Sequence, residues 1–265
     1  MRTSSNPAFK NLPKGGGYAN FNYGQPAGAF GTQGQAPTAP QQTGRPLSID
    51  DIVTKTATTL AITIGTAAAT YIIGGAASWG LALPAAIVGF VLAMANIFKK
   101  KVSPALVIAY AAVEGVFLGA VSHLFATMVN PGIIMQAIVG TMGVFAAMLV
   151  VYKTGAIRVT PKLTKWIIGA AAGAFTLMLV NLIAGFFVEG GIGIRGDGGP
   201  LAIGFSLLCI GIAAFVFLLD FDEADRAIKS GVDARFSWYI AFSLMVTLVW
   251  LYLEILRLLS YLQND

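Results

Sequence analysis

Residues 200–222 read PLAIGFSLLCIGIAAFVFLLDFD, an apolar run that ends in two aspartates. A helix needs about 20 consecutive apolar residues to cross a bilayer, and this run has that length. Six similar runs occur elsewhere in the chain, separated by turn residues, lysines or prolines. The sequence therefore predicts seven membrane spans, at about 57–78, 81–98, 104–127, 132–152, 165–188, 200–220 and 236–260.

The composition agrees with this prediction. Of the 265 residues, 56% are hydrophobic and 11% are charged, whereas a soluble domain carries about 25% charged residues. This composition does not fit a soluble enzyme, a secreted disulfide scaffold or a DNA-binding domain. The lone Cys209 also excludes an internal disulfide. We expect an all-α integral membrane protein that is not an enzyme and holds no small-molecule cofactor.

Residues 1–46 differ from the rest of the chain. Gly, Pro, Gln and Asn fill half of these positions, and no acidic residue is present. Such a segment buries too little apolar surface to offset the entropy lost on ordering. We predict a disordered cytoplasmic tail over 1–46 and a seven-helix transmembrane domain over 47–265. Aromatic residues in the tail could contact a membrane-protein partner; these are Phe9, Tyr18, Phe21, Tyr23 and Phe30.

The basic residues indicate the orientation of the chain in the membrane. If the tail is cytoplasmic, all 17 lysines and arginines except Arg195 and Arg257 lie at the cytoplasmic side. The N-terminus is then inside and the C-terminus outside. The net charge of +5 therefore reflects the topology and an attraction to the anionic headgroups of a cell membrane. It is no evidence for a nucleic-acid partner.

Carboxylates inside the spans are expensive and need a reason to be there. Glu114 lies midway along the third span, as either a functional group or a neutral acid that donates one interhelical hydrogen bond. Glu254 and Arg257 are three residues apart on one face of the seventh span, which predicts a supporting ion pair.

The end of the sixth span is acidic. Asp220 and Asp222 are two residues apart, so a helix points them about 200° away from each other and only one can face the interior. Asp222, Glu223 and Asp225 could make a weak Ca²⁺ site, because Ca²⁺ prefers several oxygen ligands. The alternative is a solvated segment whose charges pair with Arg226 and Lys229.

Spaced glycines in the spans predict surfaces where helices pack closely. The candidates are Gly65, Gly74, Gly89, Gly169 and Gly173.

Several motifs together resemble one known family. They are Ser103-Pro104 opening the third span, Glu114-Gly115 in its middle, Asn181 in the fifth span, Phe221-Asp222 ending the sixth, and Leu256-Arg257-Leu258-Leu259 in the seventh. In this order and spacing they resemble the Bax inhibitor-1 family over about residues 50–260. The opening MRTSSNPAF resembles the actinobacterial branch of that family.

The resemblance implies a bundle of six helices around a central seventh that acts as a pH-sensitive Ca²⁺ leak. It also implies two hydrogen-bonded aspartates that close the pore, of which the first corresponds to Asp222. The second position holds Thr247, which cannot ionise. Asp222 could bond to Thr247 as a simpler latch, or Glu114 and Glu254 could supply the titrating group.

Our leading hypothesis is a cation leak channel of the bacterial inner membrane, with Ca²⁺ as the permeant ion. Its ion path or gate would be formed by Asp222, Thr247, Glu114 and Asp220. The alternative is a non-conducting membrane regulator that binds a membrane protease or a stress-response partner.

Overall fold

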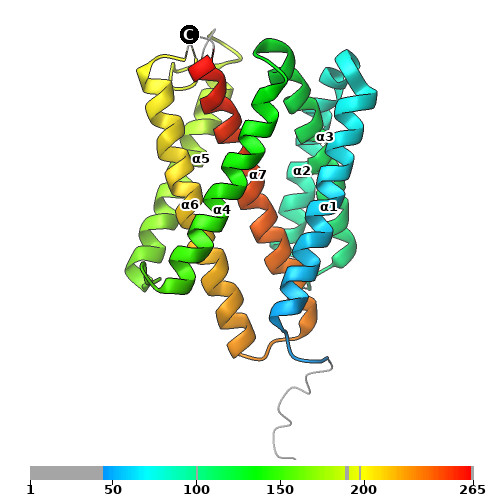
Figure 1. The fold of residues 1–265 in the computed structure, drawn as a ribbon, viewed down its shortest axis with the longest axis vertical. Helices are drawn as coiled ribbons and strands as arrows, with labels where there is room; N and C mark the ends of the chain where they lie inside the picture. Colours follow the sequence, from blue (N-terminus) through cyan, green and yellow to red (C-terminus); the bar gives the residue numbers. More distant parts are fainter. Residues whose placement is uncertain (1–43, 100, 189–190, 197, 264–265) are drawn as a thin grey trace, which may run out of the picture. The chain divides into compact units, whose positions relative to one another are not determined.

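Seven long helices make up most of the described part of the chain (Figure 1). The structure is a computed structural model of the 265-residue chain, and it describes residues 44–99, 101–188, 191–196 and 198–263. The predicted tail lies almost wholly outside the described residues. The helices are α1 (Ile49–Gly74), α2 (Trp79–Phe98), α3 (Pro104–Met128), α4 (Gly132–Thr154), α5 (Pro161–Ala184), α6 (Pro200–Lys229) and α7 (Ser237–Gln263), with short 3₁₀ turns η2 (Gly75–Ser78) and η3 (Ala234–Phe236).

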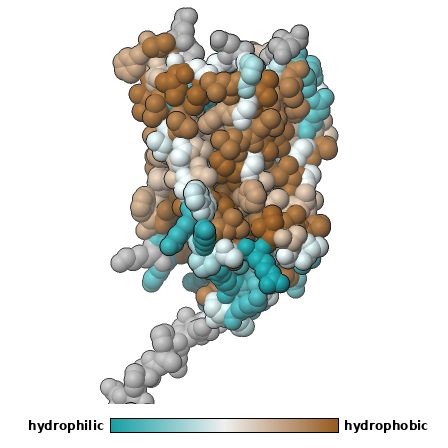
Figure 2. Space-filling model, turned by 90° about the vertical axis from the view of Figure 1, so that its left-hand side faces the viewer, coloured by the Kyte–Doolittle hydropathy of each residue, from teal (hydrophilic) through white to brown (hydrophobic). Residues whose placement is uncertain are grey.

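All seven helices are long and apolar enough to cross a membrane. Their outer surfaces are apolar as well, since large hydrophobic side chains such as Ile72, Leu83 and Leu182 are exposed. Figure 2 shows a broad apolar band on the face that it views, with hydrophilic residues gathered toward one end. The chain is therefore an all-α, multi-pass membrane protein, as predicted.

Three helices have bounds that differ from the predicted spans by four or more residues. Helix α1 begins at Ile49, because Ser48 and Asp51 form a capping box in which each side chain accepts a hydrogen bond from the other residue's backbone N–H. Helix α5 begins at Pro161, where the Thr160 hydroxyl accepts from the N–H of Leu163. Helix α6 continues to Lys229, beyond the end of the apolar run.

Helix α7 is the most buried helix of the bundle. It packs against α1, α3, α4 and α6, whereas α2 packs mainly on α3 and α5 mainly on α6. Its buried side chains Leu248, Leu251 and Leu256 belong to the main hydrophobic core. The predicted central seventh helix is confirmed, with α2 and α5 placed further out.

The closest helix approach involves glycines of α3. A Cβ on Gly115 would lie 2.4 Å from the carbonyl oxygen of Thr63, and a Cβ on Gly119 would lie 2.4 Å from that of Ala67. Only glycine allows α1 and α3 to pack at this distance. Of the glycines predicted to do this, Gly65, Gly169 and Gly173 face open space, so the prediction was wrong for those three.

Residues 45–47 are strapped to the loop between α6 and α7. The N–H of Leu47 donates to the carbonyl of Val232 at 2.8 Å, and the N–H of Ala234 donates to the carbonyl of Arg45 at 3.0 Å. Leu47 itself is buried in the main core. This strap ties the entry into α1 to the loop that joins α6 and α7.

Candidate functional site

A buried carboxylate joins α6 to α7. Asp220 of α6 is buried, and its Oδ1 accepts a hydrogen bond from the Ser243 hydroxyl at 2.6 Å. Its Oδ2 accepts a second bond from the Thr247 hydroxyl at 2.7 Å. Ser243 and Thr247 are four residues apart, so the helix places both hydroxyls on the same face of α7. We call these three side chains the Asp220 latch.

Asp222 does not take part in this latch. Its Oδ2 pairs with Arg226 at 2.7 Å, one turn further along α6, and its side chain is partly exposed. The expected bond between Asp222 and Thr247 is therefore wrong. The physical reason is the helical period: of two side chains that point about 200° apart, Asp220 occupies the interior and Asp222 points away.

The acidic residues that end α6 do not form the predicted Ca²⁺ contact. Asp225 pairs with Lys229 at 2.5 Å, as Asp222 does with Arg226. In the ranges that the structure describes, no three His, Cys, Asp or Glu side chains are grouped so that they could hold a metal ion. Cations one turn away neutralise the two aspartates, which leaves Glu223 without the neighbours that a metal site needs.

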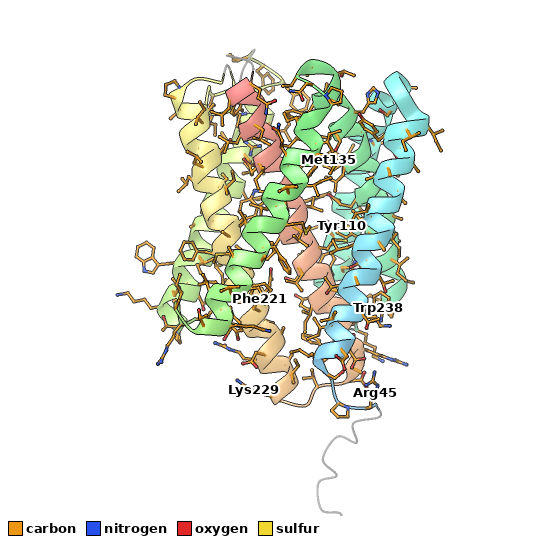
Figure 3. All side chains as sticks on the ribbon, in the orientation of Figure 1. Arg45, Tyr110, Met135, Phe221, Lys229 and Trp238 are labelled. Atoms are coloured by element: carbon orange, nitrogen blue, oxygen red, sulfur yellow. The ribbon has the colours of Figure 1, made fainter. Side chains whose placement is uncertain are left out.

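A polar pocket of about 400 Å³ reaches the latch from the end of the bundle where α6 and α7 meet their loop. Figure 3 shows Lys229 at that end of α6 and Phe221 further into the bundle. Helices α5, α6 and α7 provide the walls. The pocket is lined by Thr164, Ile168, Leu219, Asp220, Asp222, Glu223, Arg226, Tyr239, Ile240 and Ser243. The Asp220 carboxylate therefore lies between a polar pocket on one side and the apolar core on the other.

A second buried ionic contact lies toward the other end of α7. Glu254 forms an ion pair with Arg195, which comes from the connection between α5 and α6. The Arg195 guanidinium also lies 5.7 Å from the centre of the Phe205 ring, and its backbone carbonyl accepts a hydrogen bond from Tyr261 at 3.2 Å.

This contact corrects the predicted pair of Glu254 with Arg257. The connection folds back over the end of α7 and brings a cation that is distant in sequence to Glu254. Ion pairs between the described residues include no pair of Glu254 with Arg257.

The two buried contacts share one face of α7. Thr247 and Glu254 are seven residues apart, which is close to two helical turns, and their positions are separated by about 10 Å along the helix axis. Each is joined to α6 or to the connection that precedes it. The seam between α6 and α7 is thus closed by a polar contact at two levels.

The chain matches the family model described as Bax inhibitor 1 like over residues 7–264. This match covers almost the whole chain. The chain belongs to the Bax inhibitor 1 like family. No curated protein matches it. The branch of the family stays a prediction.

In this Bax inhibitor 1 like protein, Glu114 lies apart from the latch. It is buried on α3 against α2, where a Cβ on Gly89 would lie 3.0 Å from its Oε2. Among the described residues, no hydrogen bond or ion pair joins Glu114 to Asp220. The structure therefore brings together Asp220 and Thr247 of the predicted gate, and places Glu114 at a different helix contact.

Two residues of these buried contacts, Ser243 and Arg195, were not among the predicted site residues. Ser243 could have been found, because a serine and a threonine four residues apart on an apolar helix form one polar face. Arg195 carried a weaker signal, as one of the two basic residues predicted to lie outside the cytoplasmic side. Its partner depended on the path of the connection, which sequence spacing does not reveal.

Proposed function

We propose that the chain is a cation leak channel of the cell membrane, with Ca²⁺ as the permeant ion and the Asp220 latch as its gate. The observation that carries the proposal is the pair of hydrogen bonds from Ser243 and Thr247 to the buried Asp220 carboxylate. An ionisable group at membrane depth costs several kcal/mol unless it has a function or a partner. Here its partners lie on the central helix, so the contact holds α6 and α7 closed.

The polar pocket supports an entry route for a cation. Three acidic side chains, Asp220, Asp222 and Glu223, line this pocket together with one cation, Arg226, and the excess of negative charge attracts cations without forming a metal site. A cation that enters from the cytoplasmic side meets Asp220 at the inner wall. The latch must part before the ion can move on along the seam.

Protonation of Asp220 supplies a pH-sensitive step. An ionised carboxylate only accepts hydrogen bonds, whereas a protonated one also carries a donor. Bonds to the ionised form are about twice as strong as neutral ones. Protonation therefore weakens the contact with Ser243 and Thr247, so we propose that acid on the pocket side opens the gate.

The Glu254–Arg195 pair serves as a second closure in this proposal. It lies on the same face of α7, nearer the outer end if the basic end is cytoplasmic. A path along the seam would have to pass both contacts. Opening would then require a movement of α6 and of the connection before it relative to α7.

Flux into proteoliposomes tests the gate. Purified full-length protein is reconstituted with a Ca²⁺-sensitive dye inside the vesicles, and flux is measured from pH 5 to pH 8. We expect Asp220→Asn to raise flux at neutral pH and to remove the pH dependence, because the amide cannot ionise. The matched control is Asp222→Asn, two residues away on the same helix. It should keep the wild-type pH dependence, and only the pH dependence is compared, because Asp222 also lines the entry pocket. A normal pH profile in Asp220→Asn would remove this residue from the gate.

The same assay addresses the non-conducting regulator. If wild-type vesicles pass no cation at any pH, the channel proposal fails and an adaptor role is favoured. Deletion of residues 1–43, which leaves the strap at residues 45–47 in place, should then abolish capture of a membrane-protein partner. A channel should instead conduct without these residues.

A further inference from the structure

A second hollow lies on the opposite side of α7 from the latch region, between α1 and α4. Its volume is about 390 Å³. The walls include Ala68 of α1 and Ile138 of α4, and the floor includes Leu118 of α3 with Leu248 and Val249 of α7. We call this hollow the α1–α4 groove. Figure 1 shows α7 behind the space between these two helices.

The groove opens onto the lipid-facing surface. Its rim residues Ile64 and Ile72 are 62% and 76% exposed, and Ile138 and Met142 on the opposite wall are 40% and 42% exposed. All four belong to helices that can span the membrane. The groove is therefore continuous with the surface that already contacts the bilayer.

Four of the five hydroxyls that line the groove, all except that of Tyr71, form hydrogen bonds within the protein. The hydroxyls of Ser122 and Tyr252 are 2.7 Å apart and bond to each other. The Thr63 hydroxyl bonds to the carbonyl of Ala111, and the Thr141 hydroxyl bonds to that of Ala137. No hydroxyl in this set requires a ligand as a partner, so the lining selects an apolar occupant.

The groove has the length of an extended stretch of hydrocarbon. It extends along α1 from Leu60 to Ile72, a length of about 18 Å at the helical rise per residue. Its volume of about 390 Å³ gives room for part of a single acyl chain.

The composition of residues 1–46 does not match the groove. These residues are rich in Gly, Gln and Asn, whereas the lining is apolar.

We propose that an acyl chain of a bilayer phospholipid occupies the α1–α4 groove and packs against α7. The groove is apolar, and it is open to the bilayer that supplies lipid at high local concentration. The occupant would contact Leu248, the neighbour of Thr247 in sequence. This inference does not depend on conduction, because binding is measured directly.

Photo-crosslinking tests the proposal. Full-length protein is reconstituted in nanodiscs that contain a phosphatidylcholine with a diazirine near the end of one acyl chain. After irradiation, adducts are mapped by peptide mass spectrometry. We expect adducts on the floor residues Leu248 and Val249, which are 4% and 8% exposed and out of reach of lipid that remains at the surface.

Matched variants on both walls provide the control. Ala68→Trp and Ile138→Trp fill the groove, whereas Ala69→Trp and Val139→Trp place the same side chain on adjacent exposed positions that do not line it. We expect the filling variants to lower adducts on α7 by about tenfold, equivalent to about 1.4 kcal/mol of binding free energy, and the control variants to leave them unchanged.

Two results would overturn the proposal. The first is a distribution of adducts that lies only on the exposed faces of the helices and is the same in all four variants. The second is a yield of adducts on Leu248 and Val249 that neither filling variant lowers. Having two filling variants on different helices keeps the test valid if one of them does not fold.

Discussion

The Thr247 hydroxyl donates a hydrogen bond to the buried carboxylate of Asp220 at 2.7 Å, and this bond joins the central helix α7 to α6. The resemblance to the Bax inhibitor-1 family implied a second aspartate at the position of Thr247. A hydroxyl in that place makes the contact a carboxylate with two neutral donors, Ser243 and Thr247. Asp220 and Thr247 therefore cannot share a proton in the way that two carboxylic acids do.

Replacing Thr247 by aspartate should turn the latch into an acidic pair. Two carboxylates within hydrogen-bonding distance titrate as a unit with two apparent steps. We expect Thr247→Asp to move the pH profile of flux and to add a second step. The isosteric control Thr247→Val should remove one hydrogen bond to a charged group, and so lower the free energy of unfolding by about 1.5–3 kcal/mol. Flux across a pH series and thermal unfolding in detergent measure the two effects. A single-step profile in Thr247→Asp would contradict the proximity of the two side chains.

Removing only one partner of the Arg195–Glu254 ion pair should lower the free energy of unfolding more than replacing both partners by apolar residues. Arg195→Met leaves the Glu254 carboxylate buried without its cation, which costs about 3–5 kcal/mol in comparable sites. The double variant Arg195→Met/Glu254→Met should recover much of this loss, because no buried charge remains. Thermal unfolding of the two single variants and the double variant gives the coupling energy. Additive losses would show that the two side chains do not interact.

The glycines of α3 should not tolerate a side chain. Gly119→Ala would place a Cβ 2.4 Å from a carbonyl oxygen of α1, so the two helices must separate. Overpacking of this kind typically costs about 1–3 kcal/mol. Gly65→Ala on α1 is the matched control, because nothing lies within 4 Å of its Cβ position. The control should be neutral or stabilise the helix by up to about 1 kcal/mol. Equal melting temperatures for the two variants would argue against the close α1–α3 contact.

The strap should depend on Leu47 and not on the residues before it. Leu47→Asp places a charge in the main core and should lower stability by several kcal/mol. Deletion of residues 1–43 removes none of the bonds between residues 45–47 and residues 232–234. We therefore expect the deletion to retain the melting temperature of the full chain, measured in the same detergent. A large loss on deletion would assign a structural role to the preceding residues.

Much of the fold was predictable because hydrophobic length is a local property. Each span consists of consecutive residues, and the bilayer thickness sets the same length for all of them. The ends of the helices were harder to predict. The capping box at Ser48 begins α1 before its apolar run, and α6 continues past Asp220 into a charged segment. Both extensions depend on side-chain bonds and not on hydropathy.

The candidate site was predictable only in part. Helical periodicity required that one of Asp220 and Asp222 face the interior, but it could not say which, since both follow the same apolar run. The choice depends on the rotation of α6 about its axis, which packing against α7 determines. The same limit explains why Gly115 and Gly119, and not Gly65, contact a neighbouring helix.

The sequence by itself determined the number of helices, their membrane environment and the few carboxylates worth testing, because these follow from composition and from spacing along one chain. Only the tertiary structure decided the partners. Asp220 meets Thr247 across 27 residues, and Arg195 meets Glu254 across 59. Contacts over such separations depend on how whole helices and their connections are placed, and sequence spacing within a single helix carries no information about that placement.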